Sequence, residues 1–197
     1  MIRPIYLFGT SELREATRPI ECDSDELQAL IDDMIDTMNG AQGIGLAAPQ
    51  IGRQERLFVV NLSPMSESLA EEGITVPAET QVFINPEIVE ESEDDSEFEE
   101  GCLSIPDIHE DVVRPQSIRI SYLDRSFQAH EERYDSMMAR VIQHEYDHLE
   151  GILFVDLISS FRRRLLKRKL KDISEGIVEA EYPVYARNTG LVEVSKS

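Results

Sequence analysis

Two histidines four residues apart, with a glutamate directly after the first, form the pattern in this chain with the clearest chemical meaning. They are His144, Glu145 and His148, in a stretch from 137 to 149 without glycine or proline, which predicts a helix. Residues four apart lie on one face of a helix, so both imidazoles can bind one cation. The glutamate can then reach a water molecule on that cation. The alternative is a pair of solvated histidines with no metal.

A catalytic metal site usually has three protein ligands and one open position, so the two histidines need a partner. No histidine follows His148. The acidic residues that remain as candidates downstream are Glu150, Asp156, Asp172 and Glu175. Glu150 is too near the histidines to turn back onto the same ion. Upstream, Cys102 follows a glycine, which permits a close approach of the backbone. A lone cysteine is usually a small buried hydrophobe, but an acidic segment interrupted by glycine is a poor place for a core.

The rest of the pattern predicts mainly strands before this region and helices after it. Apolar residues spaced by three and four predict an amphipathic helix over 25–38. Later helices are predicted over 135–149 and 157–174. Strands are predicted over 56–62, 81–90, 117–124 and 127–131, the second of them broken at 85–86. Because strands and helices do not alternate regularly, the pattern indicates an α+β fold and not a doubly wound sheet.

The chain has 197 residues and is expected to form a single domain, residues 1–197. A glycine-rich turn follows the first helix at 43–52. Residues 63–80 have weak periodicity and are interpreted as a surface insertion. The tail, 176–197, has strand-like character without a definite assignment.

Composition excludes several classes of protein. The net charge of −20 disfavours binding to DNA or to an anionic membrane through the whole surface. No apolar run of about 18 residues is present that could span a bilayer. The N-terminus lacks the apolar core of a signal peptide, and two cysteines are too few for a disulfide framework. These features predict a cytoplasmic protein.

One segment departs from the acidic character of the chain. Residues 161–171 form a predicted basic helix that holds seven of the nineteen lysines and arginines. The side chains expected to pack on the body of the protein are Leu157, Ile158, Phe161, Leu165 and Ile173. The basic face is either a solvated surface that balances the acidic residues or a docking surface for RNA phosphates.

Three short motifs, taken together, resemble the signature sequences of peptide deformylases. They are GIGLAAPQ at 43–50, EGCLS at 100–104 and QHEYDH at 143–148, in the order and at separations compatible with that family. The resemblance implies an α+β fold in which antiparallel or mixed sheets pack around a central helix that carries HExxH, followed by a C-terminal helix. It extends from about residue 4 to about residue 171.

The resemblance also implies a set of roles. Cys102, His144 and His148 would bind one divalent metal, with Fe²⁺ expected natively and Zn²⁺, Ni²⁺ or Co²⁺ able to replace it. A metal-bound water would attack an amide carbonyl with Glu145 as general base and acid. The side-chain amide of Gln50 and the backbone N–H of Leu103 would stabilise the oxyanion. An iron–thiolate site is sensitive to oxidation, which agrees with a reducing cytoplasm.

Enzymes of this kind remove the N-formyl group from the initiator methionine of newly synthesised proteins and release formate. The resemblance implies formylmethionyl peptides and nascent chains as substrates, and the ribosome near the tunnel exit as the partner of the basic helix 161–171. The residues expected to bind the substrate are Ile44, Gly45, Leu46, Gly101, Met137 (or Met138) and Val141. His109 stands where many relatives carry an arginine that can hold the peptide, and it is not expected to bind the metal. Asp147 is a candidate for orienting a histidine ligand.

Two other functions fit part of the pattern. A zincin-type metallopeptidase would use the HExxH residues with a downstream acidic ligand and would not need Cys102. A non-catalytic, ribosome-associated module would hold a structural metal. Such a site has no use for Glu145, since that residue is not a ligand, and this favours an enzyme.

Overall fold

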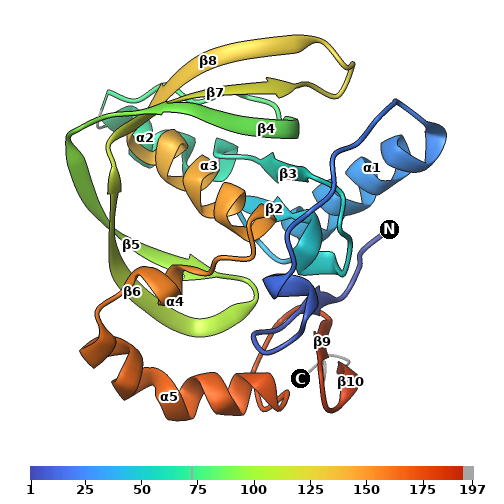
Figure 1. Cartoon of the computed structure of the whole chain (residues 1–197), viewed down its shortest axis with the longest axis vertical. Helices are drawn as coiled ribbons and strands as arrows, with labels where there is room; N and C mark the ends of the chain where they lie inside the picture. The colour runs from blue at the N-terminus through green and yellow to red at the C-terminus, as the bar shows by residue number, and fades with distance from the viewer. Residues whose placement is uncertain (72, 193–197) are drawn as a thin grey trace.

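The computed structural model describes residues 1–71 and 73–192, and within these residues the strands form three sheets (Figure 1). The largest has five strands, each antiparallel to its neighbours, in the order β2-β3-β4-β7-β8. Their bounds are Gly45–Ala47 (β2), Leu57–Val60 (β3), Gln81–Glu91 (β4), Ser117–Leu123 (β7) and Ala129–Asp135 (β8). The predicted α+β class is confirmed, and the strands over 56–62, 81–90 and 117–124 lie where the sequence placed them.

Strand β4 is irregular at the point where a break was expected. The register against β7 shifts between Ile84 and Glu87, and Asn85 has a positive φ of 49°. The side chain of Asn85 compensates, because it accepts a hydrogen bond from the backbone N–H of Ile20 at 2.8 Å and donates one to the Ile20 carbonyl at 2.7 Å. The strand predicted at 127–131 is present but runs later, as β8.

A second sheet, not expected from the sequence, is the long hairpin of β5 (Asp95–Cys102) and β6 (Ile105–Pro115). Its strands alternate between buried and exposed positions. The acidic residues of this hairpin lie mostly on its solvent side. Because they lower the mean hydropathy of the segment, the sequence did not indicate that these strands have one buried face.

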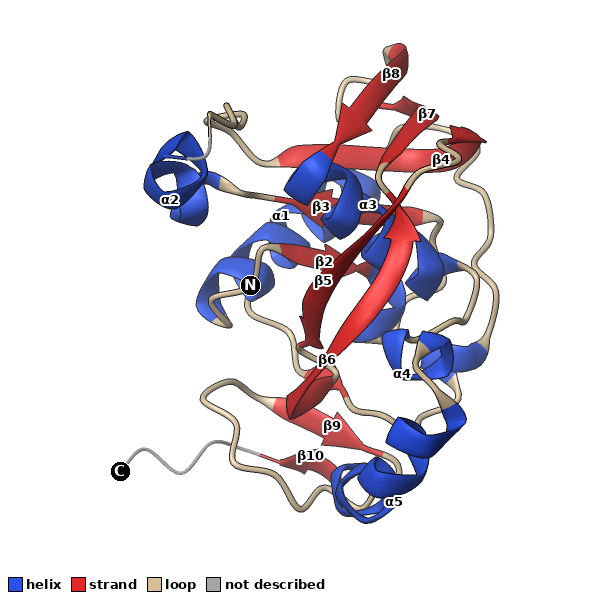
Figure 2. Ribbon diagram, turned by 90° about the vertical axis from the view of Figure 1, so that its left-hand side faces the viewer, coloured by secondary structure: helices blue, strands red, loops and turns tan. Residues whose placement is uncertain are grey.

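Helix α3 (Ser136–Leu149) lies between the five-stranded sheet and this hairpin (Figures 1 and 2). It is buried around most of its circumference, from Met138 to Glu145, as expected for a helix inside a core. On the sheet side it packs in a cluster with Phe58, Phe83 and Ile120. On the hairpin side the Gln143 amide donates a hydrogen bond to the Pro115 carbonyl at 3.0 Å.

The third sheet joins the two ends of the described chain. Strand β1 (Ile5–Tyr6) runs parallel to β9 (Val184–Ala186), which is antiparallel to β10 (Gly190–Val192). The strand-like character of the tail is therefore present up to residue 192, and 193–197 lie outside the described residues.

Shorter elements complete the path of the chain. Helix α1 (Asp25–Gly40) is capped by Ser24 and runs two residues beyond the predicted end. The described residues also contain three short 3-10 helices, which span Glu12–Arg14 (η1), Ala48–Ile51 (η2) and Ser63–Met65 (η3). Within 63–80, helix α2 (Ser66–Glu71) buries Leu69 in the same core cluster as α3, so this segment is more than a surface insertion.

The basic helix differs from its prediction in extent and in orientation. The predicted helix 157–174 is divided into α4 (Phe154–Leu157) and α5 (Ser160–Ser174), with Ser159 as the N-cap of α5. Phe161 and Leu165 were expected to pack on the body, but they are 65% and 60% exposed, and Leu157 is also exposed. Ile158 and Ile173 do pack against the body as expected, and the buried face of α5 also carries Leu170, which was not expected there. The helix turns this way because Arg162, on the neighbouring face, binds the buried Glu110 of β6 at 2.7 Å. None of the helices in the described residues is long and apolar enough to cross a membrane.

This orientation predicts opposite results for two leucines of one helix. Leu170→Ala should lower the free energy of unfolding by about 2–5 kcal/mol, because it leaves a cavity in the core. Leu165→Ala, the same change at an exposed position, should alter it by less than about 0.5 kcal/mol. Urea denaturation of both variants measures the difference, and equal losses would contradict the orientation of α5.

Candidate active site

Three potential metal ligands from distant parts of the sequence meet in the structure. Cys102 is the last residue of β5, and His144 and His148 lie on α3. Among the described residues, these three form the one group whose ligand atoms lie close enough for a single ion, all within 4.8 Å of one another. The sulfur of Cys102 is 3.3 Å from Nε2 of His148.

The local structure of the hairpin places the cysteine. Gly101 pairs with His109, but the next residue, Cys102, pairs with Ile105, so β6 accommodates three extra residues. Leu103 and Ser104 form the turn between the strands. The bulge is stabilised in part by Lys169 of α5, whose ammonium donates a hydrogen bond to the Asp107 carbonyl at 3.0 Å.

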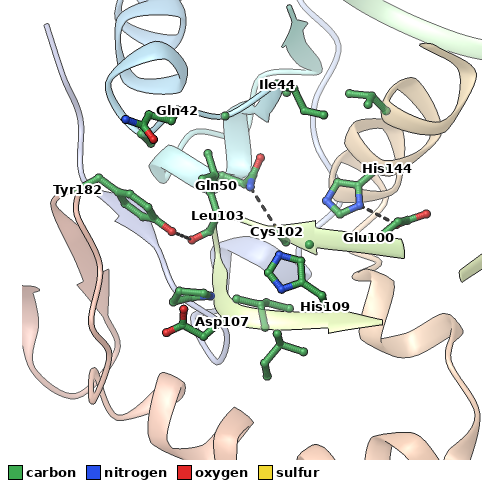
Figure 3. Close-up of a pocket in the computed structure, with 18 of the residues that line it drawn as sticks. Gln42, Ile44, Gln50, Glu100, Cys102, Leu103, Asp107, His109, His144 and Tyr182 are labelled. Atoms are coloured by element: carbon green, nitrogen blue, oxygen red, sulfur yellow. Dashed lines mark hydrogen bonds and ion pairs between the residues drawn. The ribbon is translucent and has the colours of Figure 1, made fainter. Parts of the chain in front are cut away.

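The imidazole of His144 is oriented by Glu100, a residue for which no role was predicted from the sequence (Figure 3). Its Nδ1 donates a hydrogen bond to the Glu100 carboxylate at 2.9 Å, which leaves Nε2 as the free ligand nitrogen. Asp147, the residue predicted to orient a histidine ligand, instead accepts a hydrogen bond from Arg114 at 2.6 Å. Both acids looked alike in the sequence, and only the pairing of the hairpin with α3 distinguishes them.

Glu100 is also the centre of a buried ionic cluster. Arg114 donates to its carboxylate at 2.7 and 3.0 Å, and Arg140 donates at 2.9 Å. Burial by itself would raise the pKa of Glu100, but the hydrogen bonds from His144 and Arg114 outweigh it and hold the pKa well below its usual range. The carboxylate therefore stays ionised and links the hairpin to the face of α3 that carries His144 and His148.

The donor set fits a divalent cation. One thiol and two imidazoles are the ligands of tetrahedral zinc and related sites. Burial and the nearby His144 lower the pKa of His148 well below its usual value, so this imidazole is neutral and able to bind a metal. Glu145 is fully buried beside the ligands, and its Oε2 has no hydrogen-bond partner among the described residues. Burial raises the pKa of Glu145 to about 7.

Gln50 is a buried residue of the site and does not face water. It is 1% exposed, in η2, and its Oε1 accepts a hydrogen bond from the Ala47 backbone at 2.8 Å. Its Nε2 points to Ser104 Oγ, at 3.3 Å, and to the Cys102 sulfur, at 3.5 Å. Figure 3 shows this amide beside Cys102 and Leu103 at the cavity wall.

A cavity of about 740 Å³ opens beside these residues. The predicted substrate-binding residues that line it are Ile44, Gly45, Gly101, Met137 and Val141. Leu46 differs from its expectation, because its side chain packs in the core with Met38 and Leu57; Met138 is likewise in a core cluster. A Cβ on Gly45 would lie 2.3 Å from Glu145 Oε1, so glycine is needed to let β2 pass the glutamate.

Other residues of the cavity were missed by the sequence reasoning. Glu179 and Tyr182 of the tail form part of its wall, and Asp107 lies in the β6 bulge. His109 also faces the cavity, with its ring against the backbone of Gly101, and it lies outside the three-residue donor group. No local motif indicated that the tail would return to the site.

None of the four acids considered for a zincin-type site belongs to the donor group, and Asp156 and Glu150 form ion pairs elsewhere. Asp156 pairs with Arg14 and, at 3.0 Å, with Arg163. Glu150 pairs with Arg56 at 2.6 Å. Cys102, by contrast, belongs to the donor group.

The sequence profile of the family described as polypeptide deformylase matches residues 2–164. The chain belongs to the polypeptide deformylase family. The peptide deformylase of Salinibacter ruber is 55% identical over 98% of both chains, and that of Christiangramia forsetii is 46% identical over 92% of this chain and 94% of its own. A solved structure of the Ehrlichia chaffeensis peptide deformylase, 33% identical, superposes with a TM-score of 0.80 over 89% of this chain and 98% of its own.

Membership of the polypeptide deformylase family identifies the reaction. Peptide deformylases remove the N-formyl group from newly synthesised proteins, so the predicted class of enzyme, a metal-dependent amidohydrolase, is confirmed. The Legionella pneumophila structure, 39% identical with a TM-score of 0.77 over 89% of this chain and 96% of its own, agrees with the α+β arrangement.

The buried cluster gives a test of how the deformylase site is held. Glu100→Gln should lower the free energy of unfolding by about 3 kcal/mol or more, because Arg140 remains buried without a counter-charge and Arg114 keeps only its ion pair with Asp147. It should also weaken metal binding by about 10- to 100-fold through the lost orientation of His144. Glu99→Gln, an adjacent exposed acid, is the matched control and should change neither. Denaturant unfolding and competition with a chelator measure both quantities; metal affinity unchanged in Glu100→Gln would contradict the orienting role.

Proposed function

We propose that Cys102, His144 and His148 bind one divalent metal and that Glu145, Gln50 and Leu103 act on the formyl group. The meeting of the three ligands beside the buried, unpartnered carboxylate oxygen of Glu145 carries this proposal. Fe²⁺ is proposed as the native ion, with Zn²⁺, Ni²⁺ or Co²⁺ as substitutes, because thiolate and imidazole ligands accept all four. The bound ion supplies Lewis acidity and lowers the pKa of water to near neutral.

Glu145 is proposed as the group that moves the proton. Its carboxylate accepts a proton from the attacking water and later donates one to the departing amine. A pKa raised to about 7 suits both steps, since neither protonation state is then strongly favoured near neutral pH. The backbone of Gly45 lies against the carboxylate and limits its movement.

Two donors are proposed to stabilise the oxyanion that forms on the formyl carbonyl. The Nε2 of Gln50 is one, and it is already oriented, because its Oε1 is occupied by the Ala47 N–H. The backbone N–H of Leu103 is the other, in the turn directly after Cys102. Oriented donors of this kind need no rearrangement during the reaction.

The cavity is proposed to hold the formylmethionyl end of the substrate. The small formyl group fits beside Gly45, where no side chain occupies the space next to Glu145. Ile44, Met137 and Val141 provide an apolar wall for the methionine side chain. Gly101 lines the same cavity along β5, and its missing side chain leaves room for the ring of His109. The adjacent His109 is proposed to contact the peptide where relatives use arginine.

Replacement of the proposed base separates metal binding from catalysis. Glu145→Gln should retain the metal and lower formate release from formyl-Met-Ala-Ser by about 10²–10⁴-fold, because no group of matched pKa remains to move the proton. Metal content and formate are measured on the same anaerobic preparation. Glu67→Gln, on the surface of α2, is the control and should match the parent enzyme.

Cys102→Ser completes the comparison. It should lose most of the metal and the activity together, whereas a zincin-type site would keep both. Full activity in either Glu145→Gln or Cys102→Ser would refute the assigned roles.

We also propose that α5 docks on ribosomal RNA near the tunnel exit, where formylated nascent chains emerge. Several of its basic residues are used internally, including Arg162, which binds Glu110, and Arg163, which binds Asp156. Arg164, Lys167 and Arg168 are exposed and have no ion-pair partner among the described residues. On a chain with a net charge of −20, this face is the surface suited to phosphate groups. The same proposal places the enzyme in the cytoplasm, where the thiol of Cys102 stays reduced.

Charge reversal of Arg164, Lys167 and Arg168 tests this docking. The triple variant R164E/K167E/R168E should lose ribosome cosedimentation and its dependence on salt, while formate release from a short peptide is retained. R18E/R133E/R187E makes the same change in net charge elsewhere on the surface and should still bind. Equal binding by both triple variants would contradict the docking role of α5.

A further inference from the structure

The tail of the chain forms part of the catalytic cavity, although it lies beyond the residues that the family profile matches. The profile ends at residue 164, whereas the cavity wall includes residues 179–182. Tyr182 is the member of this segment that reaches the catalytic turn (Figure 3). Its ring is partly buried, and its hydroxyl donates a hydrogen bond to the backbone carbonyl of Leu103 at 2.8 Å.

A second contact holds the next carbonyl of the same turn. The backbone N–H of Phe8, just after β1, donates a hydrogen bond to the Ser104 carbonyl at 2.8 Å. The side-chain hydroxyl of Ser104 in turn accepts from Gln50. The turn that follows Cys102 is thus held at consecutive residues from outside the hairpin.

Both external contacts originate in the third sheet. Strand β1 leads to Phe8, and β9 begins two residues after Tyr182. The pairing of these strands is fixed by hydrogen bonds from Ile5 N–H to the Pro183 carbonyl, at 2.9 Å, and from Leu7 N–H to the Tyr185 carbonyl, at 2.8 Å. The sheet therefore sets where the Tyr182 hydroxyl lies relative to the turn.

We propose that Tyr182 is a positioning residue that holds the backbone of Leu103 so that its N–H stays aimed at the oxyanion. This inference rests on the proposed role of the Leu103 N–H. A residue between two planar peptide groups has two soft dihedral angles. Cys102 restrains the peptide that carries the N–H, and Tyr182 restrains the peptide that carries the carbonyl. With both planes held, little rotation of Leu103 remains.

The protonation state of Tyr182 also favours its hydrogen bond to the Leu103 carbonyl. Burial raises the pKa of the Tyr182 phenol above its ordinary value, so the hydroxyl keeps its proton and remains a donor across the working pH range. The side chain of Leu103 is restrained as well, since its Cδ1 lies over the backbone of Gly43, where a Cβ would be only 2.8 Å away.

Tyr182→Phe removes the hydroxyl alone and tests the proposal on the full-length, metal-loaded enzyme. We expect kcat for formyl-Met-Ala-Ser to fall by about 3- to 10-fold, the scale of one lost neutral hydrogen bond. KM should stay within about twofold and metal content should be unchanged, because the proposed ligands are untouched and the ring of Tyr182, which forms part of the cavity wall, is retained. Tyr185→Phe is the matched control, since it deletes the same atom in β9 from a ring that stacks on Tyr6, and it should leave kcat unchanged.

The outcomes separate this inference from the function on which it rests. Absence of formate release by the parent enzyme would remove the proposed function itself. With an active parent, an unchanged kcat in Tyr182→Phe would overturn the positioning role, and so would a loss matched by Tyr185→Phe. Tyr182→Ala gives a second arm: a fall in kcat with Ala but none with Phe would assign the effect to packing of the ring and overturn the role of the hydroxyl.

Discussion

The buried carboxylate of Glu100 is the interaction on which the site depends. It lies on β5 and binds Arg114 of β6, Arg140 of α3 and the imidazole of His144. One ionised group thereby fixes the two strands of the hairpin to each other and both of them to the central helix. Cys102 is two residues further along β5, so the position of the thiol relative to the imidazoles follows from this cluster. A buried charge that lost these partners would be costly, which makes the arrangement specific as well as stable.

Around that cluster, each sheet contributes a different part of the site. The five-stranded sheet supports α3 from behind, and its edge strand β2 brings Gly45 against Glu145 and leads into Gln50. The hairpin brings the thiol and the turn. The small third sheet reaches the turn from the far side through Phe8 and Tyr182. The groups proposed to react are thus held by rigid elements from three directions, which is the condition for preorganised donors to lower a barrier.

The charged residues of α5 also contribute to how this helix is attached to the rest of the protein. The chain is strongly acidic, yet two basic residues of α5 are paired with acids and help to attach the helix: Arg162 pairs with Glu110 of β6, and Arg163 pairs with Asp156 of α4. The basic residues of α5 all face solvent at least in part, but only some of them have no ion-pair partner among the described residues. The apolar residues Phe161 and Leu165 share that exposed side, because the helix is anchored instead by Leu170, Ile173 and the ion pair of Arg162.

The sequence by itself determined the chemistry of this protein. The spacing of His144, Glu145 and His148 on a helix is a local property, and the motifs around Gln50 and Cys102 are contiguous, so the family, the proposed ligands and the proposed base could be predicted from short segments. Helix α1 and most strands of the main sheet were also predictable, since their apolar periodicity is local. The role of Glu100, the hairpin itself, the buried face of α5 and the return of Tyr182 were decided only by the tertiary structure. These depend on which surfaces face each other across long separations in sequence, and no local pattern records such pairings.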